Sequence, residues 1–305
     1  MFQLSQLYTN DEEYSEAAKI LNVGAEYSSI ANAQYSRILF LLSRGMMLMI
    51  TKRITEVQSC LQIVSQLVEN WNGNSSLKEG MKVFFLVLQV CHHLNCGQVK
   101  SVRQSLKLLQ QSIQNIYHFD DEYLQLGPND QFIWMPKEHM GVLVYLVTVL
   151  HSMQSGYMEK AQKYVDKAIS QIEKLRSVGN HSVLNTFQLI LLEHISMCRL
   201  VMGNRALAIK EIVQALNICY RDPKLKIRHK PLIHALLGMY AMSLNIMDTA
   251  ENQLTMSMNI SSSGHNKELC VLTSLNLAIV YLKNNKVNEL NDLLQKLNPD
   301  HLHFT

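Results

Sequence analysis

The segment from Cys91 to Cys96 concentrates thiols and imidazoles, the side chains that most often bind zinc in proteins. It reads Cys91-His92-His93-Leu94-Asn95-Cys96, inside a stretch whose residues predict a helix. On a helix, positions 91 and 96 lie about 140° apart, and the two histidines point in different directions. Four ligands cannot converge on one ion from such positions, so we predict that the segment binds no metal.

The other histidines could serve as general bases, because the imidazole pKa lies near neutral pH. His139, His151 and His194 each stand alone on a predicted helix, without a nearby acid or cysteine in a nucleophile-base pattern. The sequence contains no glycine-rich phosphate-binding motif. We therefore predict a protein that is not an enzyme, requires no cofactor and has no small-molecule substrate.

A third group of chemically active side chains is basic and comprises Lys224, Lys226, Arg228 and Lys230. We predict that residues 221–230 form a loop between two hairpins. The loop could contact the phosphates of a nucleic acid, or it could be a solvated turn, since it lacks interleaved aromatic residues. The net charge of +3 and the pI near 8.4 fall short of a dedicated nucleic-acid binder, although they do not exclude one.

Helices have to position all of these side chains, because the composition predicts an all-α chain. The 305 residues include only 5 prolines and 12 glycines, while straight-chain residues, which lose little freedom in a helix, are common. Hydrophobic residues make up 48% of the chain, which excludes a disordered protein. The longest apolar run, Val142 to Leu150, is far shorter than the ~20 residues of a membrane span. The six cysteines show no paired spacing, so we expect reduced core residues.

The helices should form repeats, because the chain resembles itself at regular intervals. After Gly156 and again after Gly203, alanines follow five and twelve residues later. This pattern suits a turn glycine that opens a second helix, whose small residues let the first helix approach closely. The small or apolar anchors of successive second helices are Ala17, Val57, Val102, Ala161, Ala208, Ala250 and Leu290, at intervals of 40 to 59 residues. The spacing predicts degenerate helical hairpins similar to tetratricopeptide (TPR) units.

The predicted architecture is an all-α solenoid, a right-handed superhelix of about seven TPR-like hairpins. Each hairpin of such a fold contacts chiefly its neighbours, and we expect a single array over residues 1–305. In residues 118–137, proline and glycine interrupt the helical period, which predicts a long inter-repeat loop. Shorter breaks are predicted at 71–76, 177–181, 221–231 and 261–266.

The likeness to TPR units assigns the first helix of each hairpin to a concave face, on which a partner would lie. The positions that this predicts to bind a partner are mainly apolar and rich in methionine: Met46, Met49, Phe84, Leu94, Leu146, Met153, Glu193, Met197, Met239 and Met242. Methionine is adaptable and suits a long polypeptide whose side chains enter shallow pockets. The alternative is that a tightly wound superhelix buries these residues against itself.

Longer strings of residues resemble one particular family. The clearest strings run from Val68 to Asn74, from Trp134 to Met140, from Val142 to Val149, from Glu159 to Tyr164 and from Leu297 to His301. With these strings the chain resembles, over nearly its whole length, the TPR subunit of the cohesin loader, the sister chromatid cohesion factor family that partners Nipped-B.

The resemblance implies a nuclear, chromatin-associated scaffold protein without enzymatic activity. Its superhelix would enclose the extended N-terminal segment of Nipped-B, and the complex would load cohesin onto chromosomes for sister chromatid cohesion. Cohesin and chromatin would be indirect partners, and no membrane would be involved. The alternative function is a generic TPR adaptor that contacts nucleic acid or another protein through the basic residues 221–230.

The resemblance also carries an expectation about the ends of the chain. Members of the family have further helical repeats on both sides, whereas this chain begins inside a first helix at Met1 and ends just past Pro299. A solenoid normally needs a capping helix with a polar outer face. We therefore expect a central fragment or a short form that lacks flanking repeats.

Overall fold

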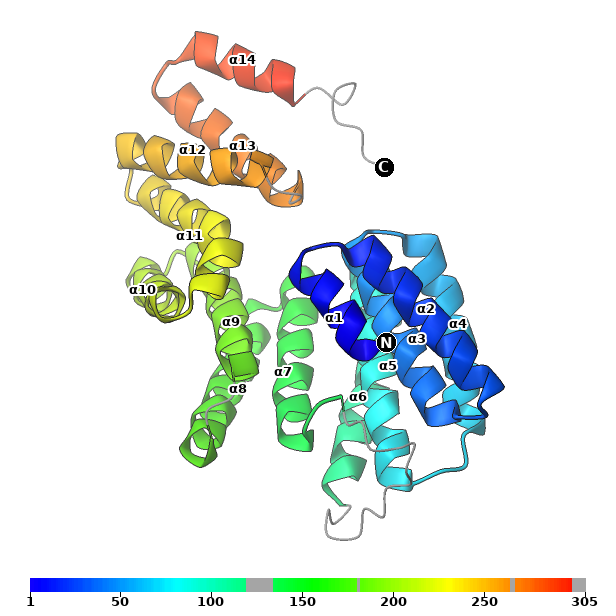
Figure 1. The fold of residues 1–305 in the computed structure, drawn as a ribbon. Helices are drawn as coiled ribbons and strands as arrows, with labels where there is room; N and C mark the ends of the chain where they lie inside the picture. Colours follow the sequence, from blue (N-terminus) through cyan, green and yellow to red (C-terminus); the bar gives the residue numbers. More distant parts are fainter. Residues whose placement is uncertain (119–133, 180–181, 264–266, 298–305) are drawn as a thin grey trace. The chain divides into compact units, whose positions relative to one another are not determined.

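The computed structural model describes residues 1–118, 134–179, 182–263 and 267–297, and all regular structure in these residues is helical (Figure 1). The helices are α1 (Phe2–Asn10), α2 (Tyr14–Ile30), α3 (Gln34–Ile50), α4 (Ile54–Asn70), α5 (Ser75–Asn95), α6 (Val99–Tyr117), α7 (Lys137–Gln154), α8 (Met158–Val178), α9 (Ser182–Val201), α10 (Arg205–Arg221), α11 (Pro223–Ser243), α12 (Met247–Ser263), α13 (Lys267–Lys283) and α14 (Val287–Lys296). The predicted all-α class is confirmed. Among the described helices, none combines the length and the apolar character needed to cross a membrane.

In chain order, the helices alternate as first and second members of seven consecutive pairs, in agreement with the repeat spacing. Every predicted anchor lies in a second helix, and the six anchors from Ala17 to Ala250 have no exposed surface. The seventh anchor, Leu290 in α14, is partly buried. The anchors from Ala17 to Ala250 are therefore alanine or valine side chains enclosed by neighbouring helices.

Each pair is joined by a short turn that contains a residue with positive φ: Glu12, Lys52, Gly97, Gly156, Gly203, Asn245 and Asn285. The turn after α9 shows the hydrogen bonds of a Schellman C-cap. The Gly203 amide donates to the Leu200 carbonyl at 3.1 Å, and the Asn204 amide donates to the Arg199 carbonyl at 2.8 Å. Glycine adopts positive φ without strain because it has no Cβ. These turns end the first helix and allow the second to begin a few residues later.

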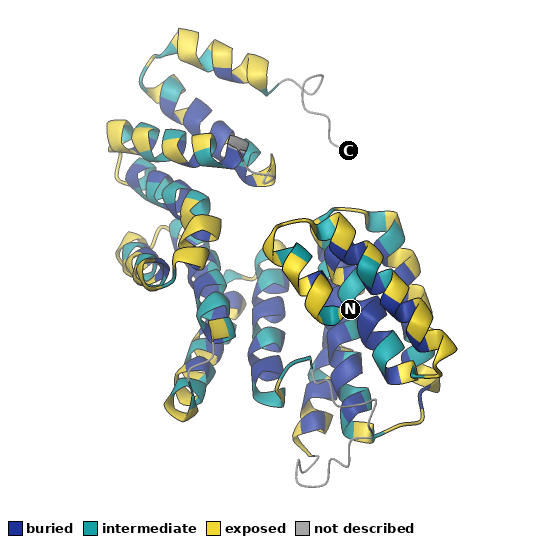
Figure 2. Ribbon diagram, viewed as in Figure 1, coloured by how far each residue is buried: buried dark blue, intermediate teal, exposed yellow. Residues whose placement is uncertain are grey.

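The helices fall into two compact units, Met1–Tyr157 and Met158–Thr305. The first unit contains α1 to α7. It has two apolar cores that meet at α5, one of which includes Leu42 and the other Leu109. Gly24 in α2 permits one close contact, because a Cβ there would lie 2.7 Å from the Phe40 ring. Phe40 also stacks on Phe2, with ring centroids 3.9 Å apart. Figure 2 shows that α5 is largely buried, whereas most of α1 is exposed or partly exposed.

The second unit contains α8 to α14 and is held together by apolar cores and by polar contacts between helices, one of which is a junction at Arg199. The cores include Leu236 between α9, α10 and α11, and Leu277 between α11, α12, α13 and α14. At the junction, Arg199 of α9 donates to Gln162 of α8 at 2.6 Å and pairs with Glu211 of α10 at 3.3 Å. A single buried guanidinium thus ties three helices together.

The loop predicted over residues 221–231 is wrong, because α10 ends at Arg221 and α11 begins at Pro223. The Asp222 carboxylate caps α11 by accepting hydrogen bonds from the amides of Lys224 at 3.0 Å and Leu225 at 3.3 Å. Proline suits the first helical position, where its missing N–H would have no partner in any case. Within the predicted loop, Pro223 instead follows a capping aspartate and starts a helix.

The predicted long loop at 118–137 falls largely on residues 119–133, outside the described residues. The described flanks agree with it, since α6 ends at Tyr117 and α7 begins at Lys137. The break at 71–76 corresponds to the short connection between α4 and α5. Residues 180–181 and 264–266 of two further predicted breaks also lie outside the described residues. The single array over residues 1–305 stays a prediction.

Candidate partner-binding surface

Seven of the ten predicted partner positions lie eleven or eight residues before the anchor of the following second helix, whereas Phe84, Leu146 and Glu193 lie earlier in their helices. The places at these two distances hold Met46 and Met49 in α3, Cys91 and Leu94 in α5, Leu150 and Met153 in α7, Met197 and Leu200 in α9, and Met239 and Met242 in α11. Within each unit, we call the surface that these positions form the first-helix face.

In the first unit, the predicted partner positions differ in exposure. Met46 is 39% exposed, and Met49 and Met153 are half-buried. By contrast, the chain itself buries Phe84, Leu94 and Leu146.

The cause of this burial is contact between neighbouring first helices. Helix α3 contacts α5, and α5 contacts α7. The Phe84 ring also stacks on Trp134, with ring centroids 4.2 Å apart, and the Trp134 indole donates to the Gly80 carbonyl at 3.2 Å. Phe84 is therefore a core residue in this structure, since its aromatic surface is already in contact with the chain's own Trp134.

In the second unit, the methionines of the first-helix face are half-buried. This applies to Met197, Met239 and Met242. Glu193, also predicted to bind a partner, is only 3% exposed, and its Oε1 is hydrogen-bonded to His229 Nδ1 at 2.8 Å. This carboxylate links α9 to α11, so within the chain it has a structural contact of its own.

Helix α13 extends the first-helix face of the second unit with residues that the sequence reasoning missed. Counted back from Leu290, the equivalent positions hold Ile279 and Leu282, which are 45% and 61% exposed. Leu275, one turn earlier on the same side of the helix, is 52% exposed. The same count that found Met197 and Met239 would have found these residues. They form the most exposed apolar row on this face.

The basic residues Lys224, Lys226, Arg228 and Lys230 are all exposed on the first turns of α11. Residues 221–230 contain no aromatic residue, as the sequence shows, but Tyr220 at the end of the preceding helix is 72% exposed. The Lys226 ammonium lies 5.3 Å from the centroid of the Tyr220 ring. A helix N-terminus carries a partial positive charge, which adds to that of these side chains. The start of α11 therefore attracts anions.

The thiols and imidazoles of residues 91–96 lie at the end of α5 and its C-cap. Burial raises the pKa of the Cys91 thiol to about 11, which keeps it protonated at neutral pH. His93 Nδ1 is hydrogen-bonded to Gln98 at 3.0 Å, and His92 Nε2 lies 4.0 Å from Cys96 Sγ. In the part of the chain that the structure describes, no three side chains of histidine, cysteine, aspartate or glutamate are grouped to hold a metal ion.

Two solved structures resemble this chain in fold. The apo form of RapI superposes with a TM-score of 0.58 at 10% sequence identity, covering 84% of this chain and 63% of that chain. BtubC from P. vanneervenii superposes with a TM-score of 0.55 at 12% identity, covering 81% of this chain and 88% of that chain. At such low identity the likeness concerns the fold alone, and it supports a TPR-like helical-repeat architecture.

Other proteins are far more similar to this chain in sequence than these two are. The chain is 45% identical over 309 residues to the MAU2 chromatid cohesion factor homologs of Drosophila erecta and Drosophila melanogaster, and 46% identical to that of Drosophila virilis. These alignments include 99% of this chain, which spans about half the length of those relatives, 48% to 49%. The family model described as cohesin loading factor matches residues 1–304. On this evidence of near-complete coverage, the chain belongs to the cohesin loading factor family.

Proposed function

We propose that the chain is a non-enzymatic scaffold of the cohesin-loading complex. It holds the extended N-terminal segment of a Nipped-B-type loader subunit and so supports the loading of cohesin onto chromatin for sister chromatid cohesion. The proposal places the protein in the nucleus, associated with chromatin, with cohesin as an indirect partner. The family match supports the cohesin-loading role.

One observation carries the proposed mode of binding, namely the apolar side chains that recur at equivalent positions of successive first helices. In the second unit these are the half-buried Met197, Met239 and Met242 and the exposed Ile279 and Leu282. A row of shallow apolar sites suits an extended polypeptide, because each site takes one side chain and methionine adapts to its shape. A segment without structure of its own loses conformational entropy when it binds, and a large buried area offsets that loss.

Co-purification of the full chain with the N-terminal segment of a Nipped-B-type subunit tests this mode of binding. The informative variants are Met197→Glu, Met239→Glu and Leu282→Glu, each of which places a charge on the first-helix face. Met256→Glu is the matched control, since Met256 is 44% exposed but lies on the second helix α12. We expect the three face variants to lose the partner and the control to retain it. Full retention by all three variants would refute the proposed face.

A second candidate function is an adaptor that contacts nucleic acid through the start of α11. The pairing of Lys226 with the exposed ring of Tyr220 favours it, because basic side chains interleaved with aromatic rings suit phosphates and stacked bases. Removing charge with Lys224→Gln, Lys226→Gln and Arg228→Gln should weaken DNA binding and flatten its dependence on salt. DNA affinity that is insensitive to salt and survives these substitutions would exclude this function.

A further inference from the structure

Helix α8 carries a row of lysines that has no role in the first-helix face. The row consists of four exposed residues: Lys160, Lys163, Lys167 and Lys174. With 3.6 residues per turn, their spacing keeps all four within about 60° of one another around the helix axis. We call this row the lysine stripe. It follows the helix over about 21 Å, because each residue adds 1.5 Å to the length of a helix.

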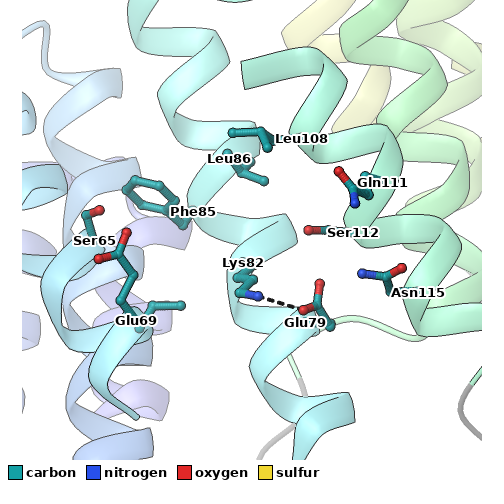
Figure 3. A pocket seen from close by; sticks show the side chains of 11 residues that line it. Ser65, Glu69, Glu79, Lys82, Phe85, Leu86, Leu108, Gln111, Ser112 and Asn115 are labelled. Carbon is teal, nitrogen blue, oxygen red and sulfur yellow. Dashed lines mark hydrogen bonds and ion pairs between the residues drawn. The ribbon is translucent and has the colours of Figure 1, made fainter. Parts of the chain in front are cut away.

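The repeat itself does not require lysine at these positions. Counted from the anchors, Lys167 and Lys174 correspond in α6 to Leu108 and Asn115, which line a pocket of about 330 Å³ between α4 and α6 (Figure 3). In α12, Met256 holds the position that corresponds to Lys167. Uncharged side chains thus occupy in other second helices the places that lysine occupies in α8. The packing of helical hairpins therefore does not explain the lysine stripe.

The four ammonium groups of the lysine stripe are not used for ion pairs within the chain. Among the described residues, no carboxylate lies within ion-pairing distance of any of them. The acidic residues of α8, Glu159, Asp166 and Glu173, form a row of their own about 90° away around the helix. Like charges three and four residues apart destabilise a helix. A ligand that neutralises the lysine stripe would offset this loss.

One aromatic side chain accompanies the lysine stripe. The Lys167 ammonium lies 5.4 Å from the centroid of the Tyr164 ring, which is within the range of a cation–π contact. This contact restricts the Lys167 side chain, so that less conformational freedom is lost when its ammonium binds an anion.

We propose that the lysine stripe binds the phosphate backbone of double-stranded DNA. Over about 21 Å of its axis, one DNA strand carries about six phosphates, since they follow at intervals of about 3.4 Å. Each of the four lysines therefore has a phosphate within reach. The ammonium group is a flexible point charge that suits phosphate, whereas bidentate recognition of carboxylates favours the planar fork of arginine, which the lysine stripe lacks. The surface lies on a second helix, and the proposal does not rest on the partner-binding function.

The test measures binding of a fluorescein-labelled, mixed-sequence DNA duplex to the full chain by fluorescence anisotropy, over a series of salt concentrations. The stripe variant replaces all four lysines by glutamine, whose helix propensity is close to that of lysine. We expect at least about tenfold weaker binding at low salt. The dependence of the logarithm of the binding constant on that of the salt concentration should become shallower by about 3.6, since each phosphate contact contributes about 0.9. Unchanged affinity and salt dependence would overturn the proposal.

A matched control removes the same number of charges from exposed lysines that do not share one helix. It replaces one lysine by glutamine in each of α2, α6, α13 and α14: Lys19, Lys107, Lys283 and Lys296. Its net charge equals that of the stripe variant, and we expect it to retain most of the DNA affinity of the wild type. Equal weakening in both proteins would show attraction by the net charge alone and would contradict the proposal.

A variant of the acidic row tests the same surface by a gain of binding. Replacing Glu159 and Glu173 by glutamine and Asp166 by asparagine removes carboxylates that repel phosphate, so DNA should bind more tightly. Affinity equal to that of the wild type would contradict the path of DNA along α8.

Poly-glutamate as a competitor separates DNA from an acidic polypeptide. We expect poly-glutamate to displace the labelled duplex less effectively than unlabelled duplex at the same concentration of negative charge. Equal displacement by the two competitors would assign the lysine stripe to acidic polypeptides and overturn the assignment to DNA.

Discussion

At the scale of single residues, the structure assigns to several side chains a contact that their position in the sequence does not reveal. Glu193 occupies a predicted partner position, yet it is buried and hydrogen-bonded to His229 from the next first helix. A sequence pattern places Glu193 on one side of α9, but it does not tell which helix covers that side. Replacing Glu193 should therefore change the free energy of unfolding of the chain.

We predict that Glu193→Ala lowers the free energy of unfolding by about 1–3 kcal/mol, because it leaves the buried His229 without its hydrogen-bond partner. Glu193→Gln retains a hydrogen-bonding group and should cost less. Urea denaturation followed by circular dichroism measures both changes. An unfolding free energy that is the same for the alanine variant and the wild type would contradict the structural role.

Thiols whose pKa is raised by the fold predict a loss of stability in alkali. Burial raises the pKa of Cys91 from 9.0 to about 11 in the folded chain. Between these pH values the unfolded chain has released the proton while the folded chain retains it, so stability falls as pH rises. The slope for one such thiol approaches about 1.4 kcal/mol per pH unit.

The measurement compares urea unfolding at pH 8.5 with unfolding at pH 10.5. Cys91→Ala should show a shallower decline than the wild type, whatever its stability at the lower pH. Cys219 titrates in the same range, since burial and the nearby Glu193 raise its pKa to about 11, so part of the decline should persist. The same slope in the wild type and in Cys91→Ala would refute the assignment to Cys91.

At the scale of elements, turn chemistry decides where helices begin and end. Asp222 and Pro223 start α11 as capping residue and first helical residue, in a stretch for which a loop was predicted. The seven turns within helix pairs each contain a residue with positive φ, which is glycine in only three of them. Glycine spacing therefore revealed the pairs around Gly156 and Gly203, whereas turns built on Glu12 or Lys52 gave no comparable signal.

The positive φ values in these turns predict opposite changes in stability for two substitutions, one that removes a glycine and one that introduces it. Gly203 has φ of 76°, and nothing lies within 4 Å of a Cβ added there, so Gly203→Ala should cost about 1 kcal/mol through backbone strain alone. Glu12 has φ of 63°, so Glu12→Gly should relieve strain and stabilise by up to about 1 kcal/mol. Thermal unfolding of the two variants measures both effects. A Glu12→Gly variant that is less stable than the wild type would contradict the second expectation.

At the scale of the whole molecule, the repeat spacing predicts the alternation of first and second helices, and the first-helix face follows from it. Equivalent positions differ in exposure along the chain, from buried Leu94 in α5 to exposed Leu282 in α13. The difference arises because α5 is covered on both sides by further first helices, whereas α13 contacts α11 on one side only in the described chain. The exposed positions are the ones at which a partner segment would gain most buried area.

We predict that the bound partner stabilises the chain against unfolding. With the N-terminal segment of a Nipped-B-type subunit at about 100 times its Kd, the gain should be about 2.7 kcal/mol, because the partner binds only the folded state. Differential scanning fluorimetry with and without the segment measures the shift in Tm. Leu282→Glu should abolish the shift and Met256→Glu should keep it. A shift of equal size in both variants would show that the partner does not bind at the first-helix face.

The sequence by itself determined the features that depend on local periodicity. These are the all-α class, the paired helices and their buried anchors such as Ala161 and Ala208, because side chains on one helix face recur at fixed spacing whatever lies opposite. Only the tertiary structure decided which side of each helix is covered. Phe84 is buried against Trp134 and Glu193 against His229, fifty and thirty-six residues away in the chain. The pocket between α4 and α6 likewise depends on how three helices pack. Periodicity along one helix contains no information on such contacts, because they depend on partners distant in sequence.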